Sequence, residues 1–311
     1  MKSVIEEKSV LNKPVFVIGV PRSGTTIIYE ALCRHELLGW LANYSEMLPA
    51  FPAMNLLRRI LDNRFISVYG HKKQHDTVVP GNRYLPQPDE AYAFWNHYAR
   101  TGFSKDYLGG MAASREEIER VRAAVLKTVR YQGRKRFSAK LTGPGRISYL
   151  SSIFPDAVFI HVIRDGRAVV NSLLRVAFWK QGGGLERPYW RNGFPDEFRG
   201  EWENTGKQAT VLAALQWRNI IEQSRKEAES LRENQYYEVR YEDWVNDPVV
   251  ASAGLLDCCG LPASAGVERY IRSTQKVRNM NSRASKVTDA GEQAVAWQAM
   301  QPLLGELGYD G

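Results

Sequence analysis

One short segment near the start of the chain restricts the possible folds more than any other feature. Residues 14–20 read PVFVIGV, a nearly continuous apolar and β-branched run that is typical of a parallel strand covered on both faces. A glycine-bounded turn follows at residues 19–24, and residues 25–34 have the pattern of a helix. Strand, glycine loop and helix in this order open a nucleotide-binding α/β fold.

The turn has the spacing of a phosphate-binding loop. Residues 19–26 read GVPRSGTT, with the G-x-x-x-x-G pattern placed between strand and helix. Glycines let the backbone N–H groups converge on an anion, and the N-terminus of the helix adds a favourable dipole. Nucleoside triphosphatases have Lys after the second glycine, whereas this chain has Thr25 there and carries its cation inside the loop, at Arg22. The loop therefore predicts a site for one terminal phosphate-type group, and ATP hydrolysis is disfavoured.

A second strand, turn and helix follow at residues 157–176. The strand ends at Arg164, and Ser172 lies two turns along the next helix. A guanidinium matches phosphate geometry through paired N–H donors, so this pair predicts a second anion site. The alternative is an ion pair of Arg164 with Asp165 at the start of the helix. His161, inside the apolar strand, is interpreted as a core histidine.

The rest of the chain alternates helical and strand patterns without an internal repeat or a low-complexity linker. We expect a single domain over residues 1–311, in which residues 1–13 are an N-terminal extension. The predicted fold class is α/β: a three-layer, P-loop-like fold with a central parallel sheet flanked by helices. Further strands are expected at residues 137–141 and 236–240. Further helices are expected at residues 50–61, 88–100, 114–131, 146–154, 207–231, 248–258, 265–273 and 292–307.

The composition restricts the classes of binding partner and the cellular compartment that we expect. The formal charge of +8 favours anionic partners, but no Lys/Arg-only tract or nucleic-acid motif occurs, so no nucleic-acid partner is expected. Three cysteines, of which Cys258 and Cys259 are adjacent, argue against a disulfide framework. The N-terminus lacks the apolar run of a signal peptide, and no segment approaches the roughly 20 apolar residues that span a bilayer. We expect a cytoplasmic protein with no membrane span.

The loop sequence PRSGTT after a β run resembles the 5′-phosphosulfate loop of sulfotransferases that use PAPS (3′-phosphoadenosine-5′-phosphosulfate). The Arg164 and Ser172 block resembles the 3′-phosphate motif of the same family. Residues 138–164, 240–248 and 307–309 look like the corresponding segments of tyrosylprotein and bacterial-type sulfotransferases. The resemblance implies transfer of a sulfuryl group from PAPS to an acceptor hydroxyl, release of PAP, and no required metal.

The resemblance also assigns roles to individual residues. Arg164 and Ser172 would bind the 3′-phosphate, and Arg22 would lie against the phosphosulfate. Lys140, near the end of a predicted strand, would contact the transferring group, as a matching Lys does in the similar enzymes. The residues implied to hold the 5′-phosphate are Ser23, Gly24, Thr25 and Thr26. The residues that would complete the nucleotide site near the C-terminus are Tyr241, Ser285 and Lys286, although Ser285 and Lys286 could equally belong to a solvated basic loop.

The catalytic base is predicted with alternatives. In relatives with a carboxylate base, a Glu follows the loop by roughly twenty residues, and Glu46 is the acidic residue nearest to that offset. The offset is slightly long, so an insertion must be assumed. Other relatives use a histidine, which makes His71 and His75 the competing candidates. The third possibility is that the base is neither Glu46 nor one of these histidines.

Residues 177–206 contain many aromatic and arginine side chains without a clean periodicity. We predict an acceptor-side loop or lid here, with Trp190 and Trp202 among its aromatic faces. The alternative is that these aromatic side chains pack the loop onto the body. The sequence leaves the acceptor open among small molecules, glycans, lipids and peptides. Two other functions remain: a P-loop small-molecule kinase or other phosphotransferase, and a non-catalytic PAP-binding module.

Overall fold

The structure is a computed structural model, and it describes residues 11–63, 66, 68–70, 84–273 and 290–309. Within these residues, one 5-stranded sheet has the order β2-β3-β1-β4-β5, and every pairing is parallel. This confirms the predicted central parallel sheet. The strands are β1 (Val15–Gly19), β2 (Leu38–Trp40), β3 (Arg136–Thr142), β4 (Val158–Ile163) and β5 (Tyr236–Arg240).

The central position of β1 explains its continuous apolar sequence. Val15 pairs with Ser138 of β3 on one side and with Val158 of β4 on the other. Every residue of β1 and β4 is buried, as expected for strands that helices cover on both faces. After β1 the chain continues toward β2, and after β4 toward β5. Such a reversal between neighbouring strands is where open α/β sheets bind ligands, at the carboxyl ends of the strands.

Helices cover the sheet on both sides and extend beyond its carboxyl end. Their bounds are α2 (Thr25–Leu32), α3 (Asn43–Met47), the 3-10 helix η1 (Pro52–Asn55), α4 (Leu56–Leu61), α5 (Tyr92–Tyr98), α6 (Arg115–Tyr131), α7 (Ile147–Ile153), α8 (Gly166–Leu173), α9 (Ala177–Gln181), α10 (Asp196–Asn204), α11 (Ala209–Ala228), α12 (Tyr241–Asn246), α13 (Pro248–Cys258), α14 (Ala265–Ser273) and α15 (Ala290–Glu306).

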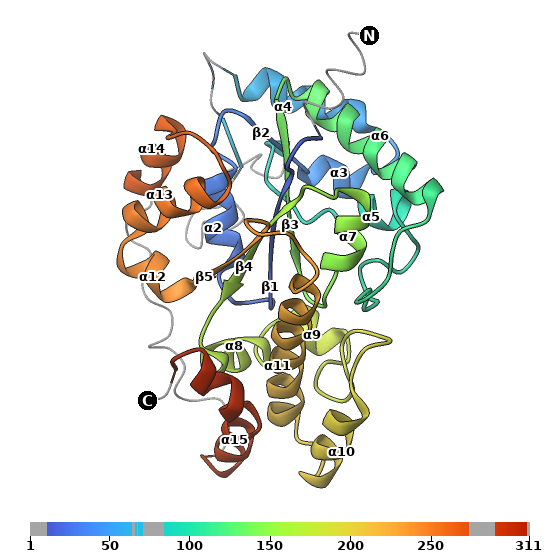
Figure 1. Cartoon of the computed structure of the whole chain (residues 1–311), viewed down its shortest axis with the longest axis vertical. Helices are drawn as coiled ribbons and strands as arrows, with labels where there is room; N and C mark the ends of the chain where they lie inside the picture. Colours follow the sequence, from blue (N-terminus) through green and yellow to red (C-terminus); the bar gives the residue numbers. More distant parts are fainter. Residues whose placement is uncertain (1–10, 64–65, 67, 71–83, 274–289, 310–311) are drawn as a thin grey trace.

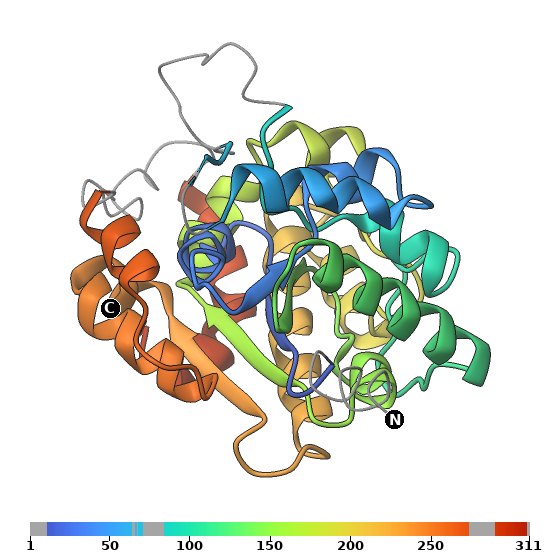
Figure 2. The ribbon, with the colours of Figure 1, turned by 90° about the horizontal axis from the view of Figure 1, so that it is seen from above.

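Alternating side chains of the strands supply two separate cores. Phe16 and Ile18 of β1 pack with residues of α5, α6 and α7, whereas Val15 and Val17 pack with residues of α2, α13 and α14. Figure 1 shows the two helical layers, with α13 and α14 on the left of the sheet and α6 and α7 on the right. Figure 2 shows the sheet between them from above. The predicted three-layer, P-loop-like class is therefore confirmed.

A third apolar cluster lies beyond the carboxyl end of the sheet, where α8, α11 and α15 pack together (Figure 1). The segment 177–206, which we expected to be irregular, contains α9 and α10 and contributes to this cluster. Trp179, Phe198 and Trp202 are buried in it. The expectation of an irregular segment was wrong for both helices. For α9 the reason is its length of five residues, too few for a helical period to appear in the sequence.

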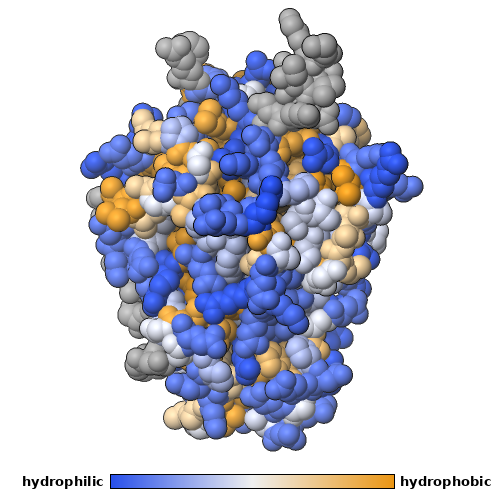
Figure 3. All heavy atoms as spheres, in the orientation of Figure 1, coloured by the Kyte–Doolittle hydropathy of each residue, from blue (hydrophilic) through white to orange (hydrophobic). Residues whose placement is uncertain are grey.

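Local signals explain the elements that the sequence predicts well. Ser114 caps α6: its side chain accepts from the Glu117 N–H, and Glu117 reaches back to the Ser114 N–H, the predicted capping box. The bounds of β5, α13 and α14 agree with the predicted ranges. In the described residues, no helix combines the length and apolar character needed to cross a membrane. Figure 3 shows mainly hydrophilic residues on one face, with apolar residues in small separate groups.

Candidate active site

The loop after β1 has the backbone of an anion-binding turn. Gly19, Arg22 and Gly24 have φ values of 151°, 79° and 94°, which only glycine adopts without strain. Gly24 precedes the first residue of α2, so the N-terminal N–H groups of the helix face the loop. The Ser23 hydroxyl donates to the Val20 carbonyl at 2.6 Å and closes the turn. Arg22, a non-glycine residue at positive φ, stores local strain, as is common at functional sites.

Gly24 has a second reason to lack a side chain. A Cβ at this position would overlap the ring of Tyr241 at the start of α12. Tyr241 is fully buried, and the guanidinium of Arg164 lies 4.3 Å from its ring centroid. The predicted nucleotide residue Tyr241 thus lies between the loop and Arg164 and supports both.

The two predicted anion sites are in direct contact. The Arg22 Nε donates to the Ser172 Oγ of α8 at 2.9 Å, and an Nη of Arg164 donates to the Arg22 carbonyl at 2.8 Å. Burial lowers the pKa of both arginines, which means that each charged form has lost solvation. Asp165, the partner in the alternative ion pair, caps α8 through the Arg167 N–H and pairs with the Arg167 guanidinium at 3.0 Å.

Lys140 also contacts the loop, and it comes from β3, the strand that pairs with β1 on the side opposite β4. Its Nζ donates to the Thr26 Oγ1 of the loop at 2.9 Å and lies 3.1 Å from the Oε1 of Glu90. The Thr142 hydroxyl donates to the same Glu90 oxygen at 2.9 Å. The structure therefore brings Lys140 against the loop, as the sequence predicts, and adds a carboxylate that the sequence does not mark.

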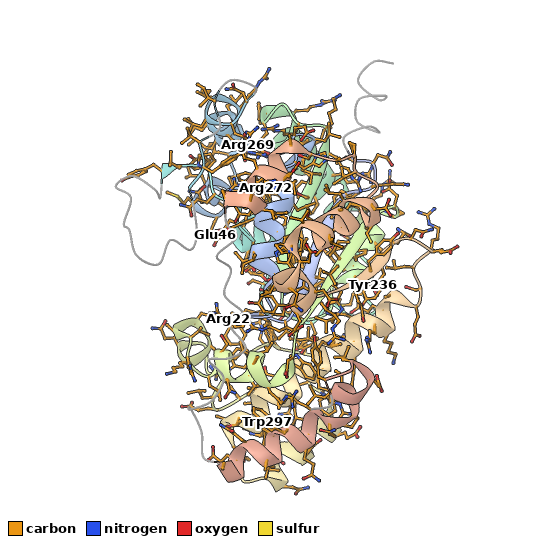
Figure 4. All side chains as sticks on the ribbon, turned by 90° about the vertical axis from the view of Figure 1, so that its left-hand side faces the viewer. Arg22, Glu46, Tyr236, Arg269, Arg272 and Trp297 are labelled. Atoms are coloured by element: carbon orange, nitrogen blue, oxygen red, sulfur yellow. The ribbon has the colours of Figure 1, made fainter. Side chains whose placement is uncertain are left out.

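Glu46 lies elsewhere. It is exposed on α3, and its carboxylate accepts from the Ala93 N–H at 2.8 Å, in the first turn of α5. Figure 4 shows Glu46 apart from Arg22, on the same side of the molecule. Glu46 does not line the cavity described next, whereas Glu90 does. The competing bases His71 and His75 fall outside the described residues, as do Ser285 and Lys286.

A cavity of about 360 Å³ lies against the loop and Glu90. The loop contributes one wall and the carboxyl end of the sheet with α5 contributes a second. A third comes from the segment between α5 and α6, from α9, and from the segment between α9 and α10. The lining residues are, in that order, Pro21, Arg22, Thr25 and Thr26; Glu90, Tyr92 and Thr142; and Ser104, Lys105, Phe178, Tyr189 and Trp190.

Arg146 fixes two of these walls relative to each other. This buried guanidinium donates to the carbonyls of Thr142 (3.4 Å), Pro144 (3.3 Å) and Phe103 (2.9 Å). Burial lowers its pKa. The Tyr92 hydroxyl also donates to the Thr142 carbonyl, at 2.5 Å. The strand end that carries Thr142 is thus bonded both to α5 and to the segment that precedes Ser104.

Sequence reasoning missed Glu90, Tyr92, Ser104 and Lys105 because they lie in no motif. Glu90 stands in the run QPDEAY before an aromatic helix, where an acidic residue usually indicates a helix start. The only signal for the third wall was the aromatic composition of residues 177–206, and that signal did not separate Trp190, which lines the cavity, from Trp202, which does not.

Comparison with known proteins identifies the family. The family model described as "Sulfotransferase family" matches residues 14–265. The chain belongs to the sulfotransferase family. The predicted resemblance is thereby confirmed, and the kinase alternative is disfavoured. The match includes the loop, Lys140, Arg164, Ser172 and Tyr241.

Curated relatives include the omega-hydroxy-beta-dihydromenaquinone-9 sulfotransferases of Mycobacterium bovis and Mycobacterium tuberculosis, each 27% identical over 267 residues. The match covers 78% of this chain and 62% of theirs, so the chain spans less than two thirds of their length. Among solved structures, a Mycobacterium avium sulfotransferase has a TM-score of 0.54 at 18% identity (98% of this chain, 79% of that one). The sulfotransferase domain of the curacin biosynthetic pathway has a TM-score of 0.53 at 12% identity (97% and 99%). These two structures share the fold.

Proposed function

We propose that this chain transfers a sulfuryl group from PAPS to an acceptor hydroxyl and releases PAP. The observation that carries the proposal is the contact between Arg22 of the loop and Ser172 of α8, with Arg164 bonded to the same loop. PAP and PAPS carry phosphate at the 5′ and 3′ positions of one ribose, so they need two anion sites a few ångströms apart. Two desolvated arginines beside a glycine-bounded helix N-terminus fit that requirement.

PAPS, when bound, supplies the sulfuryl group and a phosphate leaving group. The chain's own residues position the donor and stabilise the negative charge that develops during the transfer. The N–H groups at the start of α2 and the Arg22 guanidinium would face the 5′-phosphate, where negative charge develops as the sulfur–oxygen bond breaks. Lys140, which already contacts Thr26 of the loop, is placed to neutralise charge on the transferring group. No metal is part of this proposal.

We assign the base to Glu90 instead of Glu46. The acceptor oxygen attacks the sulfur and its proton must go to a nearby group. Glu90 lines the cavity, and Lys140 and Thr142 hold it by the single oxygen Oε1. Within the described residues, its other oxygen, Oε2, makes no hydrogen bond and can take the proton. The Glu46 carboxylate instead accepts from the Ala93 N–H in the first turn of α5. Tyr92, the residue before Ala93, forms part of the cavity wall.

We further propose that the segment 177–206 shapes the acceptor side of the site. Phe178, Tyr189 and Trp190 contribute aromatic faces to the cavity, and Phe178 is 42% exposed, so its ring is accessible from solvent. An acceptor with an apolar or ring-shaped body beside its hydroxyl suits these faces.

A reducing, cytoplasmic setting completes the proposal. The supporting observation is that Cys33, Cys258 and Cys259 are all free thiols. Burial raises the pKa of Cys33 and Cys259 to about 12, so both stay as unreactive thiols near neutral pH.

Calorimetry with PAP, and separately with ATP and magnesium, tests the donor. We expect PAP to bind, and PAP at 100 times its Kd to raise the free energy of unfolding by about 2.7 kcal/mol. The kinase alternative predicts the opposite order, with magnesium-ATP binding more tightly than PAP. Failure of PAP to bind at all would remove the proposed function.

A further inference from the structure

The acceptor side of the cavity contains a lysine whose backbone is unusually well fixed. The N–H of Lys105 donates to the Gly102 carbonyl at 2.8 Å, and its carbonyl accepts from the Arg191 N–H at 2.8 Å. The next residue, Asp106, pairs with Arg191 through a β-bridge and through an ion pair of 2.7 Å. Two of the segments that form the third wall of the cavity are therefore bonded to each other.

The residue before Lys105 is held equally firmly. The Ser104 N–H donates to the Asn96 Oδ1 and the Asn96 Nδ2 donates to the Ser104 Oγ, both at 3.1 Å. Asn96 belongs to α5, so the segment is anchored to a helix on one side and to Arg191 on the other. Such anchoring holds a binding group in position before any ligand arrives.

The ammonium of Lys105 lies over an aromatic pair. Its Nζ is 3.7 Å from the centroid of the Tyr189 ring, and Tyr189 in turn stacks on Trp179 with centroids 5.1 Å apart and an interplanar angle of 11°. A ring face attracts a cation but leaves its charge uncompensated. In the part of the chain that the structure describes, no carboxylate forms an ion pair with Lys105; Glu90, on the same cavity, pairs with Lys140. A cavity-lining cation without an acidic partner favours an anionic ligand.

We propose that Lys105 and Tyr189 form an acceptor subsite that binds the carboxylate of a ring-bearing hydroxyl acceptor. The inference rests on the proposed function and specifies its substrate class. The Lys105 ammonium pairs with the carboxylate, and the aromatic faces of Phe178, Tyr189 and Trp190 contact the ring. The acceptor hydroxyl then lies at the other end of the cavity, near Glu90 and the loop. We infer a hydroxylated aromatic acid because the third wall of the cavity combines a cation with aromatic side chains.

Two probes that share one ring and differ in the charge of the acid group test the subsite. The probes are 4-hydroxyphenylacetate, an anion at neutral pH, and its neutral methyl ester, each titrated by calorimetry into the full chain saturated with PAP. We expect the acid to bind about tenfold more tightly than the ester, equivalent to about 1.4 kcal/mol. In Lys105→Met, which keeps the apolar stem, this preference should fall to about one, and Lys105→Arg should retain it.

Matched measurements separate a subsite from a general charge effect. Lys180→Met removes the same charge from the exposed end of α9, outside the cavity lining, and should keep the tenfold preference. The Kd for PAP should be the same in all variants, which also shows that they fold. Equal affinity for acid and ester in the unsubstituted chain, binding of neither probe, or a preference that survives in Lys105→Met would each overturn the subsite. Loss of PAP binding by the unsubstituted chain would instead overturn the proposed function.

Discussion

The Nε of Arg22 lies 2.9 Å from the Oγ of Ser172, so a residue of the phosphate loop bonds a residue that the sequence places in the other anion site. The two sites are therefore parts of one polar network, in which Arg164 also holds the loop through the Arg22 carbonyl. We expect a ligand with two phosphates to replace these internal bonds with bonds to its own phosphate oxygens.

This network predicts how Ser172 affects nucleotide binding. Ser172→Ala removes the proposed donor to the 3′-phosphate and also leaves the Arg22 Nε without its hydroxyl partner. We expect the Kd for PAP to rise about tenfold, the value of one hydrogen bond to a charged group. The Kd for AMP, which has no 3′-phosphate, should change much less. Calorimetry with both nucleotides measures the difference, and equal losses for PAP and AMP would contradict a 3′-phosphate role.

Gly24 should not tolerate any side chain. In Gly24→Ala, the positive φ costs about 1–2 kcal/mol, and the new methyl group overlaps the buried Tyr241 ring. We expect a lower free energy of unfolding and at least about a tenfold loss of PAP affinity. Gly254→Ala is the matched control: this glycine lies in α13 with no atom near its Cβ position, so alanine should stabilise the helix by about 1 kcal/mol. PAP binding by Gly24→Ala at the original affinity would exclude this account.

The choice between Glu90 and Glu46 can be made by comparing two amide variants. Glu90→Gln should lower kcat by about a factor of 10² to 10⁴, because it removes the proposed base. The Kd for PAP should stay nearly unchanged, because the residues proposed to bind the nucleotide are unaltered. Glu46→Gln should retain most of the activity, because its side-chain oxygen still accepts from the Ala93 N–H. Steady-state kinetics with an identified acceptor, giving kcat for both variants, will decide between Glu90 and Glu46 as the base. The reverse order of the two losses would return the base to Glu46.

Two tryptophans of the segment 177–206 should behave differently. Trp190 lines the cavity and is also buried in the third apolar cluster, so Trp190→Ala should raise the acceptor KM at unchanged PAP affinity and also lower the free energy of unfolding. Trp202 is 5% exposed and its Nε1 donates to the Gln208 carbonyl at 3.0 Å in the third apolar cluster. Trp202→Ala should therefore lower the free energy of unfolding by about 3–5 kcal/mol. Denaturant titration and KM measurements on both variants check the assignment, which an unchanged KM in Trp190→Ala would oppose.

His161 gives the fold a dependence on pH. The Tyr236 hydroxyl donates to Glu238 at 2.8 Å, so the His161 Nδ1, 2.6 Å from that hydroxyl, must carry the hydrogen and donate. Burial lowers the pKa of His161 to about 4, below its ordinary value of about 6.5. The unfolded chain then binds the proton more readily, so stability is complete above about pH 6.5 and decreases as the pH falls toward 4.

The expected loss between about pH 7.5 and pH 4.5 is about 2–3 kcal/mol from this residue. His161→Asn, which keeps a donor but cannot titrate, should show a smaller decrease over the same range. Denaturant unfolding at the two pH values, with the unsubstituted chain in parallel, provides the comparison. An identical decrease in both proteins would assign the pH dependence to other groups.

The sequence predicted four of the five strands, and it marked candidate residues for the nucleotide side of the site, but it did not mark the three-residue edge strand β2. The strand before the loop, the cation at Arg22 and the separation of Arg164 from Ser172 are local patterns, and each has a direct physical meaning. The acceptor side was different, because Glu90, Lys105 and Trp190 come from three separate segments. Only the packing of these segments, tied by Arg146 and by the Asp106–Arg191 bridge, creates their common surface, and no spacing in the chain encodes it.

The pairing of β1 with β3 and β4 also has a consequence for biosynthesis. Val15 emerges from the ribosome long before Ser138 and Val158, its neighbours in the sheet. The first strand therefore stays without its neighbours in the sheet until about 120 further residues have been made. Chaperones that cover exposed apolar segments would find this one early, and a translational pause placed before β3 should lengthen that exposure.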